Sequence, residues 1–204
     1  MKILLTTLNS KFIHTNLAIR YLRESVKDLV KVDVREYTIN NQLDYILKDI
    51  YKHDYDVVLF STYIWNIYDI VKLCENLKKV KPEIKIGLGG PEVTYDSENA
   101  MEKYEFLDYI LCGEGELVFR SLVEHFLGEK NIEDVKGIVY RKDGQIIVKN
   151  TITSSPDVSY VPDSESSTMM LDFDDTGEDQ EIYLYFCDKN LTQYKKILIY
   201  QFSC

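Results

Sequence analysis

The sequence predicts an α/β fold whose core is a doubly wound parallel sheet of five strands. Apolar runs of strand length alternate along residues 1–127 with segments in which apolar residues recur at helical spacing. The run 57–60 is apolar throughout, which is typical of a parallel strand covered on both faces. Glycine is absent from the first 86 residues, and three of the nine glycines then fall within 87–90. Because strands that alternate with helices are joined by right-handed crossovers, we expect a parallel sheet.

Each strand is predicted from its own pattern. The first is a short apolar run, the second alternates as a more exposed strand should, and the third contains the fully apolar run. The fourth and fifth are short apolar runs, each preceded by a helical pattern. The expected strands are 3–7, 32–37, 56–61, 84–88 and 107–111. Five such units favour the flavodoxin-like (Rossmann-like) strand order 2-1-3-4-5.

The segments between these strands carry apolar residues three and four positions apart, which indicates amphipathic helices. The strongest pattern places Leu117, Val118, Leu122 and Phe126 on one side of a helix. The helix after the third strand ends before Pro82, a residue that cannot continue it. The expected helices are 16–30, 41–51, 67–79, 96–104 and 114–127.

The composition changes along the chain and predicts four segments. Residues 1–130 form the α/β domain, and 131–150 an appended C-terminal β-hairpin that turns at Lys142-Asp143-Gly144. Residues 151–181 hold nine acidic residues and no lysine or arginine, which predicts a disordered acidic linker. Residues 182–204 are apolar again but too short for a domain, and we interpret them as the start of a further one.

Charge and cysteine content disfavour several classes of function. A net charge of −10 without a basic stripe disfavours nucleic-acid binding. No apolar run approaches the ~20 residues that span a membrane, and the start does not resemble a signal peptide. We therefore expect a cytoplasmic protein with no membrane partner. The four cysteines lack zinc-ligand spacing, and no pair of residues suggests acid–base or nucleophilic chemistry, so no catalytic or metal-ligating residue is assigned.

The candidate site lies at the carboxyl ends of the strands, where open parallel sheets bind their ligands. Gly89-Gly90 removes two side chains from the end of a central strand, which leaves a slot for a flat or elongated group or marks an ordinary strand-to-turn transition. Ser61 and Thr62 either hydrogen-bond a ligand or cap the next helix. Four segments fall at this edge, namely 8–15, 61–66, 89–94 and 113–116.

The same loops argue against the usual phosphate ligands. Phosphate loops place glycine directly after the first strand, and this chain has none there. The hydroxyl pairs Thr6-Thr7 and Ser61-Thr62 stand where a phospho-receiver needs carboxylates. Glu114 and Glu116 complement the dipole of the helix that they open, and they also repel phosphate. A large, nearly neutral ligand rich in amides suits these loops better.

Four motifs occur here in a fixed order, over roughly residues 1–150: Leu8–Arg20, Gly89–Val93, Asp108–Glu116 and Gly137–Gly144. In order and spacing they resemble the N-terminal cobalamin-binding domains of B12-dependent radical SAM proteins. The resemblance implies a flavodoxin-like domain that binds cobalamin at the carboxyl edge of the strands, with the nucleotide tail threaded toward the sheet. The cofactor-binding residues that it implies are Asn9, Ser10, Lys11, His14, Ser61, Thr62, Tyr63, Gly89, Gly90, Pro91, Glu92, Gly113 and Glu114.

The resemblance implies a module of a larger enzyme that performs methyl transfer, or oxidative cyclisation as in magnesium-protoporphyrin IX monomethyl ester oxidative cyclase-like proteins. Its C-terminal radical SAM domain would hold S-adenosylmethionine and a 4Fe–4S cluster on a C-x3-C-x2-C motif. That motif is absent, and Cys204 ends a segment similar to the strand that leads into it. We therefore expect a truncated chain that is not catalytic alone. The alternatives are a flavodoxin-like sensor that binds flavin or a nucleotide, and a non-catalytic interaction domain.

Besides lacking the C-x3-C-x2-C motif, the sequence differs from many B12 domains at the residue that would ligate the cobalt. Many B12 domains carry D-x-H-x-x-G after the first strand, where the histidine ligates the metal. The corresponding residues here are Asn9 to His14, with Lys11 at the position of the ligand. The sequence therefore predicts cobalamin bound without a histidine below the cobalt, which should give a base-off spectrum.

Overall fold

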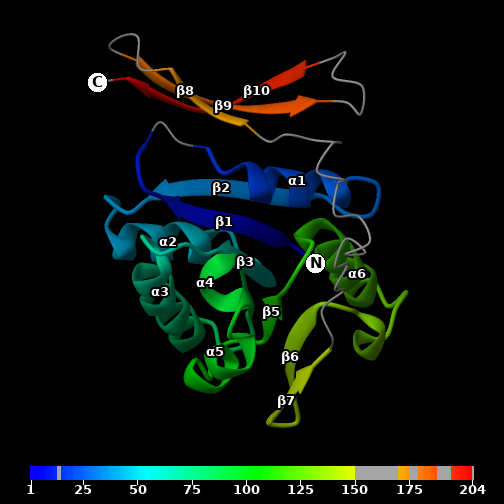
Figure 1. Ribbon diagram of the computed structural model, residues 1–204. Helices are drawn as coiled ribbons and strands as arrows, with labels where there is room; N and C mark the ends of the chain where they lie inside the picture. The colour runs from blue at the N-terminus through cyan, green and yellow to red at the C-terminus, as the bar shows by residue number, and fades with distance from the viewer. Residues whose placement is uncertain (13–14, 150–169, 175–178, 188–193, 204) are drawn as a thin grey trace. The chain divides into compact units, whose positions relative to one another are not determined.

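The fold was analysed in a computed structural model, which describes residues 1–12, 15–149, 170–174, 179–187 and 194–203. The chain divides into two compact units, 1–153 and 154–204. The first unit is a sheet flanked by helices, and the second is a small antiparallel sheet (Figure 1). Every site residue predicted from the sequence belongs to the first unit.

Five strands of the first unit pair in parallel in the order β2-β1-β3-β4-β5, as the sequence predicts. The fully apolar run lies in β3 at the centre of this sheet, where it is buried on both sides. The bounds are Ile3–Asn9 for β1, Val32–Thr38 for β2, Val57–Ser61 for β3, Lys85–Gly89 for β4 and Tyr109–Leu111 for β5.

The appended hairpin differs from the prediction because it continues the same sheet. β6 (Ile138–Lys142) pairs antiparallel with β5, and β7 (Gln145–Val148) pairs with β6, so the sheet has seven strands. The amide of Cys112 donates to the carbonyl of Gly137 at 2.7 Å, next to this pairing. β6 thereby covers a row of backbone groups on β5 that a five-stranded sheet would leave as an open edge.

Helices cover both faces of the sheet, and each has its own apolar core. α1 and α6 pack on one face, and α2, α3, α4 and α5 pack on the other. The bounds are Leu17–Ser25 for α1, Leu43–Lys52 for α2, Ile67–Val80 for α3, Pro91–Thr94 for α4, Ser97–Lys103 for α5 and Gly115–Phe126 for α6. A 3-10 turn, Ile132–Asp134, precedes β6.

Two details of these helices depart from the expected ranges. α1 ends at Ser25, five residues before the predicted end, and the amide of its C-cap Val26 turns back to the carbonyl of Arg23. α4 is an additional single turn that begins at Pro91, a residue favoured at the start of a helix because it has no amide hydrogen to leave unpaired.

The second unit is described only by its backbone pairing. Its three strands are β8 (Met170–Asp174), β9 (Asp179–Cys187) and β10 (Tyr194–Ser203), in the order β10-β9-β8. β8 and the start of β9 fall in the range 151–181, which the sequence assigns to a linker. The rest of that range lies outside the described residues, so the linker and the boundaries of the four segments stay a prediction.

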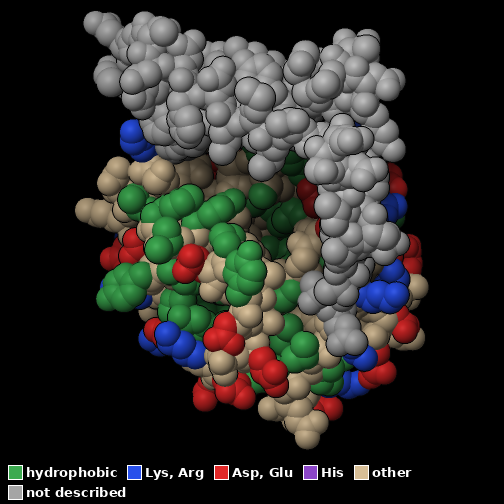
Figure 2. All heavy atoms as spheres, in the orientation of Figure 1, with side chains coloured by type: hydrophobic (Ala, Val, Ile, Leu, Met, Phe, Trp, Pro, Cys, Tyr) green, Lys and Arg blue, Asp and Glu red, His purple; other side chains and the backbone are tan. Residues whose placement is uncertain are grey.

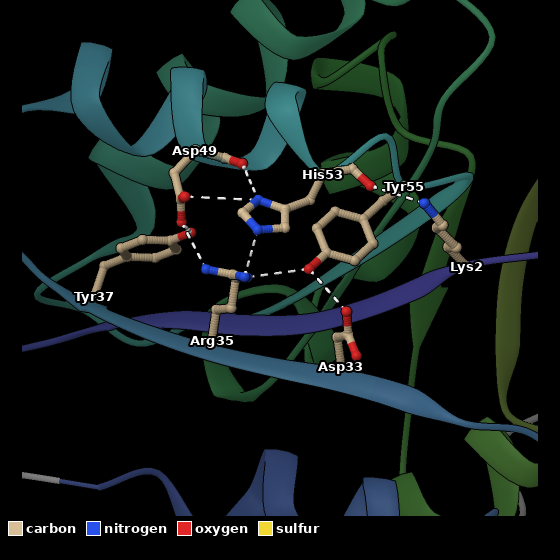
Figure 3. Close-up of polar contacts among 7 residues, drawn as sticks. All are labelled: Lys2, Asp33, Arg35, Tyr37, Asp49, His53 and Tyr55. Carbon is tan, nitrogen blue, oxygen red and sulfur yellow. Dashed lines mark hydrogen bonds and ion pairs between the residues drawn. The ribbon is translucent and has the colours of Figure 1, made fainter.

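A polar network joins β2 to α2 at one edge of the sheet (Figure 3). Arg35 donates to Asp49 Oδ2 at 3.0 Å and to the Tyr55 hydroxyl at 3.1 Å, and Tyr37 donates to the same Asp49 oxygen at 2.7 Å. Arg35 Nη2 lies 2.7 Å from His53 Nε2, and since a guanidinium only donates, Nε2 is the acceptor. His53 Nδ1 then carries the hydrogen toward the carbonyl of Asp49, at 2.7 Å.

Candidate functional site

The four predicted loops follow four parallel strands, so the sheet brings them to one edge. β1, β3, β4 and β5 end at Asn9, Ser61, Gly89 and Leu111. Ser61 and Gly89 are register partners, and so are Gly89 and Leu111. The ends of β3, β4 and β5 are therefore direct neighbours.

A cavity of about 750 Å³ opens among these strand ends and extends between the sheet and the helices α1 and α6. Its lining is mainly apolar. Strand residues in the lining are Leu5, Leu59, Phe60, Ser61, Leu88, Gly89 and Leu111, and helix or loop residues are Ala18, Ile19, Leu22, Tyr63, Gly90, Pro91, Thr94, Tyr95, Gly113, Gly115 and Glu116. This volume lies within the range of ordinary small-molecule and cofactor sites.

Glycine in β4 contributes to this hollow. Gly87 and Gly89 are two positions apart, so both would direct a side chain toward the α1 and α6 face. A Cβ on Gly87 would lie 2.4 Å from Leu59 Cδ2, so the end of that leucine side chain would have to move, and 3.3 Å from Tyr109 Cβ, a tight contact. Packing therefore favours glycine at this position. A Cβ on Gly89 would meet only Leu111, at 3.8 Å, an ordinary contact. The fold therefore tolerates a side chain at Gly89, where the empty space forms part of the cavity.

Gly90 is required for a different reason. Its φ is +107°, a conformation that other residues rarely adopt, and a Cβ would lie 2.4 Å from the carbonyl oxygen of Thr62. Thr62 in turn holds the carbonyl of Gly89 with both its amide, at 2.7 Å, and its hydroxyl, at 2.8 Å. The β3 and β4 loops are thus fastened to each other at the rim of the cavity.

Asn66 fastens the β3 loop to β1 from beneath. Its side chain is fully buried, and its oxygen accepts from the amide of Tyr63 at 2.7 Å. Its Nδ2 donates to the carbonyl of Leu8 at 3.0 Å and lies 3.3 Å from both Thr7 Oγ1 and the carbonyl of Ser61. One amide side chain therefore ties together the carboxyl ends of the two central strands, and sequence reasoning did not single it out.

The loop after β1 is anchored to β2 by a carboxylate. Glu36 accepts from Asn9 Nδ2 at 2.8 Å, from the amide of Asn16 at 2.7 Å, and from Thr15 and Arg20 at 2.8 and 2.6 Å. Burial by itself would raise the pKa of Glu36, but these hydrogen bonds outweigh it and the pKa is lowered. The Asn9 side-chain amide therefore donates to Glu36, and this hydrogen bond helps to hold the loop after β1 in place.

The cavity gathers some of the predicted residues and not others. Ser61, Tyr63, Gly89, Gly90, Pro91 and Gly113 line it. Asn9, Ser10, Lys11, Thr62, Glu92 and Glu114 are not in the lining, although all lie on the same strand ends or loops. Lys11, which the sequence analysis expects at the position where many B12 domains carry a histidine ligand, is exposed, and His14 lies outside the described residues. Their roles in cofactor binding stay predictions.

The apolar wall was not predicted as part of a site. Leu5 and Leu59 are register partners on β1 and β3, and Ala18, Ile19 and Leu22 face them from α1. Gly115, in the first turn of α6, approaches Leu22, whose Cδ2 would lie 3.1 Å from an added Cβ. In the sequence these residues have the same periodicity as residues of a filled core, so only the glycine at 115 signals close packing.

Exposed aromatic and aliphatic side chains gather near the mouth of the cavity. Tyr95 is 93% exposed, Ile64 is 78% exposed, and Trp65 stacks on Tyr63 with ring centroids 4.6 Å apart. Figure 2 shows hydrophobic side chains collected on the face of the molecule that carries α3 and α4. Tyr63 and Tyr95 also line the cavity, so the apolar rim is continuous with its interior.

Among the residues that the structure describes, no cluster of three or more His, Cys, Asp or Glu side chains is placed to hold a metal ion. Cys74 and Cys112 are buried thiols, and burial raises the pKa of each. No helix in the described ranges is long and apolar enough to cross a lipid bilayer.

The chain belongs to the B12-binding domain family, whose sequence model matches residues 3–123. That match spans the five parallel strands and most of α6, and so includes all four loops of the cavity rim. Cobalamin is the cofactor of this domain. The resemblance found in the four sequence motifs is therefore confirmed at the level of the family.

Similar proteins include the uncharacterized methyltransferase PH0819 of Pyrococcus horikoshii, which is 29% identical to this chain over 101 residues. The aligned region covers 50% of this chain and 22% of PH0819. The cobalamin-dependent radical SAM methyltransferase TokK of Streptomyces tokunonensis is 31% identical over 94 residues, which cover 46% of this chain and 14% of TokK. The chain therefore matches less than a quarter of the length of these relatives.

Solved structures share the fold. The cobalamin-dependent S-adenosylmethionine radical enzyme OxsB, with aqua-cobalamin and S-adenosylmethionine bound, aligns with a TM-score of 0.63 at 19% identity, over 74% of this chain and 22% of OxsB. The radical S-adenosylmethionine methyltransferase TsrM of Kitasatospora setae, with cobalamin and a [4Fe-4S] cluster bound, aligns with a TM-score of 0.62 at 13% identity, over 74% of this chain and 29% of TsrM. At these identities the likeness establishes the fold.

Proposed function

We propose that this chain binds cobalamin with its nucleotide tail in the cavity beside Gly89, as the cobalamin-binding module of a radical SAM methyltransferase. The observation that carries the proposal is the 750 Å³ cavity at the carboxyl edge of the strands in a chain of the B12-binding family. The named relatives are methyltransferases, which supports methyl transfer and gives no support to oxidative cyclisation.

The residues present fit such a group on two counts. The space beside Gly89 is one that a Cβ could enter without clashing with the fold, so it is a cradle that the protein leaves open. The rim and the interior also differ in chemistry: Ser61, Tyr63 and Thr94 provide polar groups among the strand-end loops, whereas Leu5, Leu59 and Leu22 line the space between sheet and helices. This arrangement matches a ligand with an amide-rich ring system and an apolar base at the end of its nucleotide tail.

The chain's own residues hold and orient the ligand. Gly90, Pro91 and Thr62 fix the shape of the β4 loop, since Gly90 alone fits against the Thr62 carbonyl and Pro91 begins the turn of α4. The apolar wall excludes water from the interior, and the Asn66 hydrogen bonds keep the β1 and β3 loops in place. When bound, cobalamin supplies a cobalt centre that can carry a methyl group.

The remaining chemistry belongs, under this proposal, to a radical SAM partner that supplies S-adenosylmethionine and a 4Fe–4S cluster. Support comes from the structures of similar fold: OxsB was solved with S-adenosylmethionine bound and TsrM with a [4Fe-4S] cluster bound, in chains that this one matches over 22% and 29% of their length. The module would then present cobalamin to the partner at the strand edge. The substrate that receives the methyl group is not assigned.

The test is retention of cobalamin by the 204-residue chain. Purified protein is incubated with hydroxocobalamin and desalted, and its visible spectrum is recorded. We expect about one equivalent of corrinoid to be retained with a base-off spectrum, since exposed Lys11 stands where the family's histidine ligand would be. A chain that emerges colourless, or that binds flavin instead, contradicts the proposal.

A size series at Gly89 tests the location. Gly89→Ala should keep binding within about tenfold, because a Cβ has room, whereas Gly89→Leu should fill the cradle and abolish retention. The matched control is Gly144→Ala in the β6–β7 turn, where an added Cβ meets nothing within 4 Å but φ is +80°. It should cost about 1 kcal/mol of stability and leave binding unchanged. Full binding by a folded Gly89→Leu variant contradicts this location.

A further inference from the structure

The hydrogen-bonding side chains of the cavity lie on the strand-end loops, and the wall between the sheet and the helices has none among the described residues. Leu5, Leu59 and Leu111 face the cavity from three strands and are at most 7% exposed. Ile19 and Leu22 close it from α1. The part of the cavity between sheet and helix is therefore lined by hydrocarbon, and a group that enters it loses its hydration without gaining polar partners from these side chains.

Several polar groups of the lining already form hydrogen bonds within the chain, and the hydroxyls of Ser61 and Tyr63, which accept a bond from Asn16 and can still donate one, lie on the strand-end loops rather than on the hydrocarbon wall. Asn16 Nδ2 lies 3.4 Å from Ser61 Oγ and 3.5 Å from the Tyr63 hydroxyl oxygen. Thr94 Oγ1 donates to the carbonyl of Gly90 at 2.7 Å. The carbonyl of Gly89 is occupied by the amide and hydroxyl of Thr62. Glu116, the charged residue in the lining, is exposed in the first turn of α6.

We infer that this wall selects among corrinoids by the base that ends the nucleotide tail, and prefers a methyl-substituted benzimidazole to a purine. The inference rests on the proposed function and adds the ligand class that its cavity accepts. Adenine carries an exocyclic amine and several ring nitrogens that need hydrogen-bond partners when buried. Dimethylbenzimidazole turns two methyl groups and a hydrocarbon edge to its surroundings, and apolar contact with leucine side chains suits these.

The experiment compares three ligands on the full 204-residue chain: cobalamin, adeninylcobamide and cobinamide, which lacks the nucleotide tail. Dissociation constants are measured by visible absorbance and by quenching of Trp65, the single tryptophan, at the cavity mouth. We expect cobalamin to bind at least tenfold more tightly than adeninylcobamide, and cobinamide to bind most weakly. Equal or tighter binding of adeninylcobamide overturns the inference.

Failure of the inference and failure of the proposed function give different results. If all three ligands bind with equal affinity, the chain still binds corrinoids, but the cavity does not discriminate between their bases. If none of them binds, the proposed function itself fails and the selection with it. The readout is affinity alone, so it does not depend on the activity of a complete enzyme.

A leucine-to-asparagine pair tests whether the wall is responsible. Leu22→Asn places an amide in the lining from a partly buried position on α1, and should shrink the preference for cobalamin over adeninylcobamide at least threefold. The matched control is Leu47→Asn, a partly buried leucine on α2 that packs against the opposite face of the sheet. The control should lose stability to a similar degree and keep the preference. An unchanged preference in a folded Leu22→Asn variant contradicts the assignment to this wall.

Discussion

The two faces of the parallel sheet are built from the same strands, yet one is filled throughout and the other, which we call the hollow face, has a core that opens into a cavity at the carboxyl ends of the strands. On the α2 and α3 face, Leu4, Val58, Ile86 and Leu88 lie fully buried in one continuous core. On the α1 and α6 face, the inner positions of β4 are Gly87 and Gly89, which have no side chains, and the cavity opens beside Gly89. The hollow therefore arises where a strand lacks side chains, within a fold that is otherwise close-packed.

The polar groups of the two faces serve different ends as well. On the filled face the network of Arg35, Asp49, Tyr37 and His53 connects β2 to α2, and its groups are bonded to one another (Figure 3). At the rim of the hollow face, Asn66 and Thr62 hold backbone loops in place around a space. We therefore expect the network around Asp49 to matter for stability alone, and the hydrogen bonds of Asn66 and Thr62 to matter for both stability and ligand binding.

The largest effect is expected from Asn66→Ala. The variant leaves the amide of Tyr63 and the carbonyl of Leu8 without their partner in a buried site, which should cost about 3 kcal/mol of unfolding free energy. Because the β1 and β3 loops lose their tie, cobalamin affinity should fall too. Urea denaturation and absorbance titration measure the two effects. Asn99→Ala, at an exposed residue that bonds only Asp96 in the described structure, is the control and should change neither.

Asp49→Ala should lower stability without touching the cofactor. It removes the acceptor of the Tyr37 hydroxyl, whose pKa is raised by burial and by this hydrogen bond, and it also removes the carboxylate that pairs with Arg35. We expect a loss of about 2 kcal/mol in urea denaturation and a cobalamin dissociation constant within twofold of the unmodified chain. Asp44→Ala, exposed on the same helix, is the control. A tenfold loss of affinity in the Asp49 variant would show that the two faces are coupled.

The fold could be predicted from the sequence because its signals are local. The apolar run of β3 and the helical spacing of α6 each specify one element, and the parallel order follows from their alternation. The hairpin of β6 and β7 was predicted correctly as a hairpin, but its pairing with β5 was not, because no pattern within residues 138–148 indicates which sheet edge they pair with.

The site could be predicted only in part, for a related reason. The glycines at 89, 90 and 113 are visible because an absent side chain is a sequence signal. Leu5, Leu22 and Leu59 are not, because a leucine that lines a cavity has the same spacing as one that fills a core. Asn66 reaches residues 58 and 59 positions away, and such long-range hydrogen bonds leave no local pattern.

Glu36→Gln should have a smaller effect that depends on pH. Because hydrogen bonds lower its pKa in the folded chain, Glu36 stabilises the fold fully above its ordinary pKa of about 4.3, and this contribution is lost as the pH falls through the folded-state value. The variant should lose about 1 kcal/mol at pH 7, and the difference should shrink as the pH falls through the folded-state pKa of Glu36. Urea denaturation at several pH values checks this, with exposed Glu98→Gln as the control. A difference that is constant with pH would contradict it.

The smallest effect is expected at the outer edge of the hollow face, where Arg120 of α6 holds Asp28, just beyond α1, through two hydrogen bonds of 2.7 Å. The Arg120 hydrogen bonds lower the pKa of Asp28 to about 2, yet the pair is exposed and water screens it. Arg120 also donates to the carbonyl of Ser25 at 2.6 Å, and this bond survives Asp28→Asn. We therefore expect cobalamin affinity to change less than twofold and the melting temperature to move slightly, with that shift disappearing at about 0.5 M salt. A large, salt-resistant loss of affinity would mean that this ion pair, rather than the apolar wall, holds α1 and α6 at the spacing that the cavity requires.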